Sequence, residues 1–362
     1  MAQGFASTDD MDEKQISFNE IGAGCYAFTA EGDPNSGVII GDDSVMVIDA
    51  QATPVMAEKV ISRIRKITDK PIKHVVLTHY HAVRVLGASA YEASEIISSD
   101  LTRTMINERG KQDWDSEFGR FPRLFQAADT IPGLTWPTQT FFTAMSVWLG
   151  KREVRLMHLG RGHTMGDIVA WVPDEKVMFS GDLVEYKSAC YCGDAHLKDW
   201  PGTLDRVGVF KPEALVPGRG NALENADKVA EGLTLTGEFV DDLYSSVSGA
   251  VKNGADLNDA MGAARNVMDP KYADYAIYEH CMPFNVARAF DEASGRDHPA
   301  IWTAERDQDM WASLQQSDDG GKSGAEDQIK VTDDKEDPEA ERDLEVEQSG
   351  DETDKQPSDA LA

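Results

Sequence analysis

Short apolar runs separated by turns predict a series of β-strands in the first two thirds of the chain. Runs at 24–29, 36–40 and 44–48 come first, and the residues at 41–43 supply a turn between the last two. Similar runs follow at 74–77, 95–98, 145–148, 153–158, 168–172, 177–180 and 214–216. Apolar runs of this length are typical of buried strands and are too short for most helices.

Apolar residues at helical spacing lie between several of these strands. They predict helices at 54–67, 85–93, 101–109 and 200–209. Strands that alternate with helices are typical of an α/β fold. The stretch from 111 to 137 has no regular period and is too long for a plain connection, so we interpret it as an insertion near a site. Its aromatic residues, and those that follow up to Trp148, either line a substrate pocket or pack in the core.

Composition divides the 362 residues into four parts. We expect a flexible N-terminus at 1–15, an α/β domain at 16–221, a helical region at 222–315 and an acidic, disordered tail at 316–362. Residues 317–362 contain 17 acidic and 5 basic side chains and no aromatic ones, which is too little apolar surface to offset the entropy of ordering. The helical region either covers the active site or forms a homodimer interface.

The net charge of −29 and the small number of cysteines restrict the partners and the compartment. Nucleic acids and anionic membrane surfaces are poor partners for so acidic a chain. Four cysteines are too few for a disulfide scaffold of this length. The N-terminal residues do not resemble a signal peptide, and no apolar stretch approaches the roughly 18 residues of a membrane span. We therefore expect a soluble, cytoplasmic protein that acts on a small molecule.

Three histidines and one aspartate follow the ends of predicted strands. His79 and His81 come after the run at 74–77, His163 lies in the turn at 160–167, and Asp182 follows the run at 177–180. Imidazole and carboxylate groups that converge from strand ends suit a borderline cation such as zinc. Iron and manganese accept the same ligands.

These turns together resemble the metallo-β-lactamase superfamily. The residues at 78–81, Thr-His-Tyr-His, look like the start of its HxHxDH signature. Those at 162–167 look like its GHTxGD turn, and those at 179–182 like its strand-end bridging carboxylate. The resemblance covers roughly 16–221. It implies a four-layered αβ/βα sandwich with metals at the sheet edges, here followed by a helical C-terminal region as in the glyoxalase II-like and alkyl sulfatase-like branches.

The chain departs from the family pattern at three positions. The pattern implies Asp at Val83, His at Arg84 and a metal-binding His at Arg219. The three-histidine site is therefore complete. The second metal site lacks all three ligands that it does not share with the first. Our hypothesis is that Arg84 and Arg219 replace the charge of the second metal, neutralise Asp182 and hold an anionic substrate group. The alternative is that both arginines are structural ion-pair partners, Asp182 included.

Three imidazoles with an open fourth position resemble a catalytic zinc site. The resemblance implies a hydrolase with one zinc ion that acts on a small anionic ester, thioester or lactone. Asp182 would orient the water or accept its proton, and Asp167 would fix the tautomer of an imidazole. One alternative is an iron oxidoreductase of the persulfide dioxygenase type, although those relatives keep the Asp-His pair that is lost at Val83 and Arg84. The other is a binding protein without activity.

Further residues are weaker candidates. Cys190 and Cys192 either reach a metal or are small packing residues. His196, in the same loop, is a candidate ligand or proton carrier. His280 and Cys281 fall in the helical region, and we interpret them as packing residues.

Overall fold

Two β-sheets form the framework of the protein. The computed structural model describes residues 6–315, so the predicted disordered tail and the first five residues lie outside the described residues. The first sheet contains β1 (Ser17–Gly22), β2 (Cys25–Ala30), β3 (Asp33–Ile40), β4 (Val45–Ile48), β5 (Ile72–Val76), β6 (Glu95–Ser99) and β7 (Gln139–Phe141) in that order. The second sheet runs in the order β12-β11-β10-β9-β8, with β8 (Ala144–Leu149), β9 (Arg152–Met157), β10 (Val169–Val172), β11 (Val177–Gly181) and β12 (Ala214–Pro217).

The direction of the strands brings the ligand turns together. β4 to β7 are parallel in the first sheet, and β11 and β12 are parallel in the second. Parallel neighbours end at the same edge of a sheet, which is where open α/β sheets bind ligands. The backbone N–H of Ile168, before β10, donates to the carbonyl of Thr78, after β5, over 2.9 Å. The turns that follow β5, β11 and β12 therefore meet at one edge of the sandwich.

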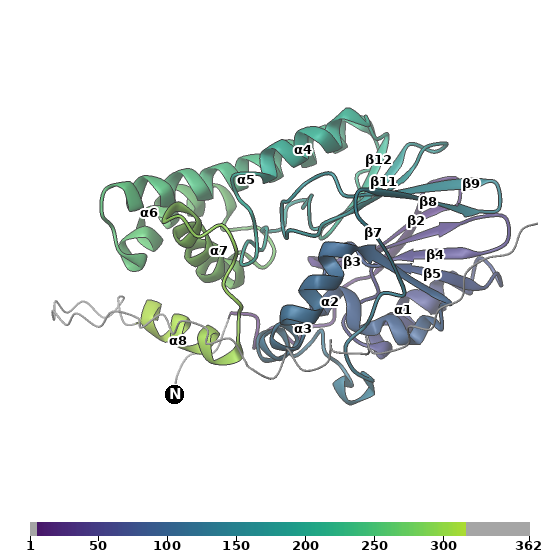
Figure 1. The fold of residues 1–362 in the computed structure, drawn as a ribbon, viewed down its shortest axis with the longest axis horizontal. Helices are drawn as coiled ribbons and strands as arrows, with labels where there is room; N and C mark the ends of the chain where they lie inside the picture. The colour runs from purple at the N-terminus through teal and green to yellow at the C-terminus, as the bar shows by residue number, and fades with distance from the viewer. Residues whose placement is uncertain (1–5, 316–362) are drawn as a thin grey trace, which may run out of the picture. The chain divides into compact units, whose positions relative to one another are not determined.

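Helices cover the outer face of each sheet (Figure 1). The helices are α1 (Pro54–Ile64), α2 (Ala82–Val85), η1 (Leu86–Tyr91), α3 (Asp100–Arg120), η2 (Ala128–Thr130), α4 (Trp200–Val209), α5 (Ala226–Lys252), α6 (Leu257–Tyr272), α7 (Tyr278–Ala293) and α8 (Ala304–Gln315). Buried side chains of both sheets, such as Ile39 and Phe179, pack together between them. The predicted αβ/βα sandwich with a helical C-terminal region is thus confirmed. Among residues 6–315, no helix has the length and apolar character needed to cross a membrane.

Helix α3 corrects the prediction of an irregular insertion at 111–137. The helix continues to Arg120, eleven residues beyond the predicted end at 109. Its buried positions include Arg109, Asp113, Glu117 and Arg120, which recur at helical spacing but are charged. A search for apolar periodicity does not detect a helix whose buried face is polar.

The remaining differences between the predicted and the observed elements lie at the edge strands of the sheets and at helix ends. The prediction missed β1, whose side chains are mostly exposed, and the three-residue β7. The helix expected at 85–93 is a short α-helix followed by a 3-10 helix. Residues 11–15 form neither helix nor strand, although Asp10 just before them pairs with Arg123 over 3.2 Å.

Gly37 allows the two sheets to approach each other, because a Cβ at this position would overlap the ring of Phe179. We expect Gly37→Ala to lower the free energy of unfolding by about 1–3 kcal/mol through overpacking. Gly119→Ala is the matched control, since Gly119 lies in α3 with open space around it and alanine favours a helix by about 0.5–1 kcal/mol. Urea unfolding of both variants measures the difference, and equal stabilities would contradict the packing argument.

Candidate metal centre

Asp49 and Thr78 fix the ring of His79. Asp49, at the end of β4, accepts hydrogen bonds from the backbone N–H and the hydroxyl of Thr78, both over 2.8 Å. The Thr78 hydroxyl oxygen lies 2.9 Å from His79 Nδ1. Because the hydroxyl proton is directed to Asp49, the oxygen accepts from Nδ1–H. The lone pair of His79 is then on Nε2, which faces away from Thr78.

Asp194 has the same effect on His81. Its Oδ2 lies 3.2 Å from His81 Nε2, and its Oδ1 accepts from Arg109 Nη1 over 2.9 Å. Burial opposes ionisation of Asp194, but His81 and Arg109 outweigh it and hold its pKa below the ordinary value. The carboxylate can only accept, so His81 Nε2 carries a proton and Nδ1 faces the other two rings.

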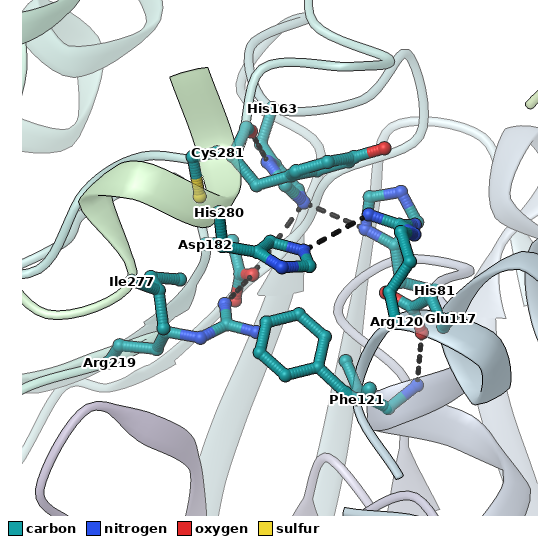
Figure 2. A pocket seen from close by; sticks show the side chains of 12 residues that line it. His81, Glu117, Arg120, Phe121, His163, Asp182, Arg219, Ile277, His280 and Cys281 are labelled. Carbon is teal, nitrogen blue, oxygen red and sulfur yellow. Dashed lines mark hydrogen bonds and ion pairs between the residues drawn. The ribbon is translucent and has the colours of Figure 1, made fainter. Parts of the chain in front are cut away.

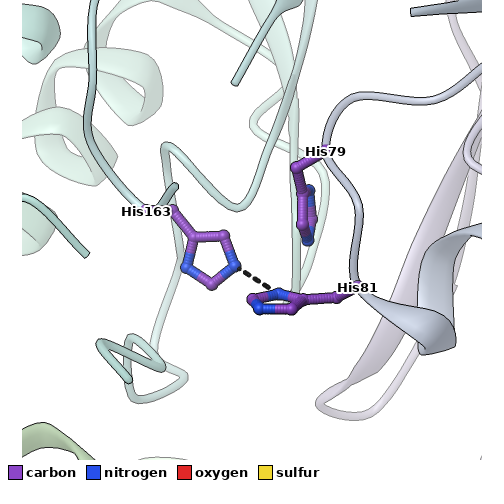
Figure 3. Close-up of side chains that lie close together, drawn as sticks. All are labelled: His79, His81 and His163. Carbon is purple, nitrogen blue, oxygen red and sulfur yellow. Dashed lines mark hydrogen bonds between the residues drawn. The ribbon is translucent and has the colours of Figure 1, made fainter. Parts of the chain in front are cut away.

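The backbone carbonyl of Tyr191 orients the third ring. It lies 2.8 Å from His163 Nδ1, which therefore donates and leaves the lone pair on Nε2. The inward nitrogens of the three rings lie within 4.8 Å of one another (Figure 3). His79 Nε2 is buried and has no hydrogen-bond partner among the described residues. Three fixed rings that direct their lone pairs to one point fit a metal ion with open coordination positions.

At neutral pH two of the three rings are neutral, as metal ligands must be, and the third must lose a proton before it binds a metal. Burial lowers the pKa of His79 well below its ordinary value and that of His163 to about 3. Burial also opposes the charged form of His81, but Asp113 and Asp194 outweigh it and raise its pKa to about 9. The proton occupies the 2.9 Å contact between His81 Nδ1 and His163 Nε2. A bound cation must displace this proton.

Asp182 lies beside the cluster and pairs with two guanidinium groups. Its Oδ2 is 3.6 Å from His163 Nε2 and 3.8 Å from His79 Nε2, close to the roughly 3.4 Å between ligands of a tetrahedral zinc ion. Arg219 Nη1 contacts Oδ2 at 3.0 Å, and Arg84 Nη2 contacts Oδ1. Burial opposes ionisation of Asp182, but Arg84, His79 and Arg219 hold its pKa below the ordinary value.

The two arginines differ in what else they contact. Arg84 is fully buried and also donates to the carbonyls of Asn35 and Gly218, each over 2.9 Å. Arg219 lines the cavity beside the histidines and lies 3.6 Å from Glu185, whose pKa is raised well above its ordinary value by burial and by the charge of Asp182. Both arginines therefore pair with Asp182, but Arg219 also faces the cavity.

A cavity of about 10 Å³, room for about one water molecule, lies against His81 and His163 (Figure 2). Its walls are formed by His81, Val83, Glu117, Arg120, Phe121, His163, Asp182, Tyr191, Arg219, Ile277, His280 and Cys281. Within this set Ile277 is half-buried and the others are buried. Ile277 also has a φ of 57°, which is strained for a β-branched residue.

Helix α3 supplies site residues that the sequence interpretation missed. The Asp113 carboxylate accepts from the backbone N–H of Ala82 over 2.6 Å, and that of Glu117 accepts from Val83 over 2.9 Å. These bonds cap the short helix α2 directly after His81. The signal in the sequence was the recurrence of charged residues at helical spacing. His280 and Cys281 line the cavity from the start of α7, whereas we had interpreted them as packing residues.

Other candidates lie elsewhere. The Asp167 carboxylate accepts from the N–H and hydroxyl of Thr164, over 2.8 and 2.6 Å, so it holds the turn, and the Asp167 backbone carbonyl lies 2.8 Å from Nδ1 of His158, which is not one of the three clustered histidines. His196 is buried 3.9 Å from Asp297, and Cys190 and Cys192 are buried free thiols. In the part of the chain that the structure describes, the potential ligands form a single group, His79, His81 and His163. Of the aromatic residues at 111–137, Phe121 lines the cavity, while Phe118 and Trp136 are partly exposed.

Comparisons with known proteins agree with this geometry. The model of the metallo-β-lactamase superfamily matches residues 29–219. A linear primary-alkylsulfatase from Pseudomonas sp. is 22% identical over 240 residues, which are 56% of this chain and 44% of the relative. A metallo-β-lactamase type 2 from Pseudomonas aeruginosa is 23% identical over 166 residues, 45% of this chain and 57% of the relative. The chain thus spans about half the length of these two relatives. The crystal structure of DIM-1 metallo-β-lactamase aligns with a TM-score of 0.50 and 16% identity, over 64% of this chain and 99% of that one.

The proton shared by His81 and His163 gives a pH prediction. Below pH 9, the approximate pKa of His81, zinc must displace one proton. We therefore expect the apparent affinity for zinc to rise roughly tenfold per pH unit from neutral pH toward pH 9 and then to level off. Calorimetric titration in buffers of different ionisation enthalpy measures the released proton. An affinity that does not change with pH over this range would contradict the assignment.

Proposed function

Since the chain belongs to the metallo-β-lactamase superfamily, we propose that it is a metal-dependent hydrolase with about one zinc ion per chain. Its substrate is a small anionic ester, thioester or lactone. One observation carries the proposal: three imidazoles are fixed from outside by Thr78, Asp194 and the Tyr191 carbonyl, and their free nitrogens converge. Histidines that only pack in a core do not need partners that fix each ring in the tautomer with its free nitrogen toward the other two.

The residues around the cluster have separate tasks in this mechanism. A zinc ion, when bound, acidifies water and polarises the carbonyl group of an ester. Asp182 Oδ2 lies within 3.8 Å of two of the ligand nitrogens, so it either completes the ligand set or accepts a hydrogen bond from the attacking water. Its two guanidinium partners keep it ionised and therefore able to accept. Arg84 has no access to the cavity from its buried position, so it acts by positioning Asp182.

Arg219 supports an anionic substrate. It lines the cavity, and its guanidinium cannot lose its charge at any physiological pH. It can stabilise negative charge that develops on oxygen during ester cleavage. The relative named linear primary-alkylsulfatase also supports an ester of an anionic acid as the substrate class.

The cavity has room for about one water molecule, so an opening step is required before an ester binds. Ile277 is the half-buried residue of the cavity wall, and it lies at the start of α7 in a strained conformation. We propose that this segment moves when substrate enters, as loops do at many enzyme active sites.

Metal content tests the proposal first. We expect elemental analysis of untagged protein to find about one zinc ion per chain, and the zinc to be lost in His79→Ala. His74→Ala is the matched control, because His74 belongs to the same segment but pairs with Glu95 over 2.9 Å. A screen of carboxylic, thio- and sulfate esters then measures hydrolysis. Iron in place of zinc would favour the oxidoreductase, and a folded protein without metal would favour a binding protein.

Substitution of the two arginines separates their roles. Both Arg219→Gln and Arg84→Gln remove one partner of the buried Asp182 carboxylate, and we expect each to lower the free energy of unfolding by about 3 kcal/mol or more. Only Arg219 lines the cavity, so we expect Arg219→Gln to lower kcat/KM of the folded protein for an anionic ester roughly 10- to 100-fold, and by more than Arg84→Gln does. Arg155→Gln, which alters a surface pair with Glu153, is the control for both measurements. Unchanged kinetics in Arg219→Gln would exclude a role for this guanidinium in the reaction.

A further inference from the structure

Arg120 and His280 form a hydrogen-bonded pair in the wall of the cavity. Arg120 Nη1 lies 3.2 Å from His280 Nε2 (Figure 2). A guanidinium group has only donors, so Nε2 must accept and the ring proton must be on Nδ1. The pair therefore has a defined tautomer without any assumption about a ligand.

Each member of the pair has an unused donor. Within residues 6–315, Arg120 Nη2 and His280 Nδ1 have no hydrogen-bond partner. The two residues are 1% and 2% exposed, so bulk water does not compensate for the missing partners. Buried polar groups are normally paired, and unpaired ones indicate a bound water or ligand.

Aromatic rings hold both side chains in place. The Arg120 guanidinium carbon lies 4.3 Å from the ring centre of Phe284 and 5.3 Å from that of Tyr191. Its Nε donates to Ser116 Oγ over 3.1 Å and lies 3.5 Å from Asp307. The His280 ring lies 3.9 Å from that of Phe121. Side chains fixed in this way lose little freedom when they bind a partner.

The charges that face the cavity favour an anion. Arg120 and Arg219 both line it, and Asp182 is shared between Arg219 and Arg84. Glu117 also lines it, but its Oε2 accepts from the backbone N–H of Val83. The free hydrogen-bonding atoms of the Arg120–His280 pair are donors, and a cluster of donors with a fixed positive charge binds oxyanions.

We propose that Arg120 and His280 bind an oxyanion of the substrate, a carboxylate, sulfate or phosphate group, in the cavity that His81 and His163 also line. The assignment to substrate rests on the proposed hydrolase function. The pair and two of the histidines line the same cavity, so the anionic group of the substrate lies close to the bond that is cut.

Calorimetric titration of the purified protein with sodium sulfate, sodium phosphate and sodium acetate tests the subsite. We expect at least one anion to bind, and Arg120→Gln and His280→Phe each to weaken it roughly 10- to 100-fold. His280→Phe keeps the aromatic contacts and removes only the donor and the acceptor. Arg123→Gln is the matched control: Arg123 is another buried arginine, paired with Asp33 at 2.5 Å, and it does not line the cavity. The anion that binds most tightly indicates which charged group the substrate carries.

Circular dichroism and the metal content of each sample separate the outcomes. If Arg120→Gln does not fold, two other variants still test the subsite. One is His280→Phe, and the other is Arg120→Lys, which keeps the positive charge but loses the planar, paired N–H donors of the guanidinium group. Equal anion affinity in wild type, Arg120→Lys and His280→Phe would overturn the proposal, even if the protein hydrolyses esters. Loss of binding in these variants supports an oxyanion subsite, even if no metal is found and the hydrolase function fails.

Discussion

The buried carboxylate of Asp182 between two buried guanidinium groups is the interaction on which the site depends. Charges taken out of water are stable only when they are paired and hydrogen-bonded, and the loss of one partner leaves the others uncompensated. Arg84 extends the pairing to the backbone, because it also binds the carbonyls of Asn35 and Gly218 at the start of β3 and the end of β12. The same side chain therefore joins strands of both sheets at the edge where the histidines converge. The position of the ligand turns follows from electrostatics as well as from apolar packing.

Most strands and the turns of the three histidines could be predicted from the sequence, and the resemblance of those turns to the metallo-β-lactamase superfamily implied the sandwich. Most strands are short apolar runs, and each ligand lies in a local turn that follows a run, so residues close together in sequence are enough to identify them. The exceptions are β1 and β7, which are not such runs. The outer partners of the rings could not be predicted in this way. His81 and Asp194 are 113 positions apart, and Arg120 and His280 are 160 apart, so only the folded chain brings them together. The part of helix α3 beyond residue 109 escaped prediction for another reason: its buried positions include Asp113, Glu117 and Arg120, whose hydrogen-bond partners are distant in sequence, and a sequence window cannot detect that pairing.

Guanidinium groups line the cavity of a strongly acidic chain. The chain carries −29, and Arg120 and Arg219 line the cavity among buried carboxylates that include Asp182 and Glu117. At physiological salt, surface charges act over about 8 Å, so most of the acidic surface is screened from a group inside the cavity. An anionic molecule is thus repelled by the surface during its approach, and it meets hydrogen-bond donors of Arg120 and Arg219 only inside the cavity.

The enclosure of the cavity by α3 and α7 bears on how the protein acquires its metal. At equilibrium, imidazole sites follow the Irving–Williams order and bind copper or nickel in preference to most competitors. If the segment at Ile277 must open before an ion enters or leaves, as proposed above, ion exchange is slow after the C-terminal helices have packed over the histidines. The metal that the protein holds would then depend on which ions are available during folding as well as on their relative affinities.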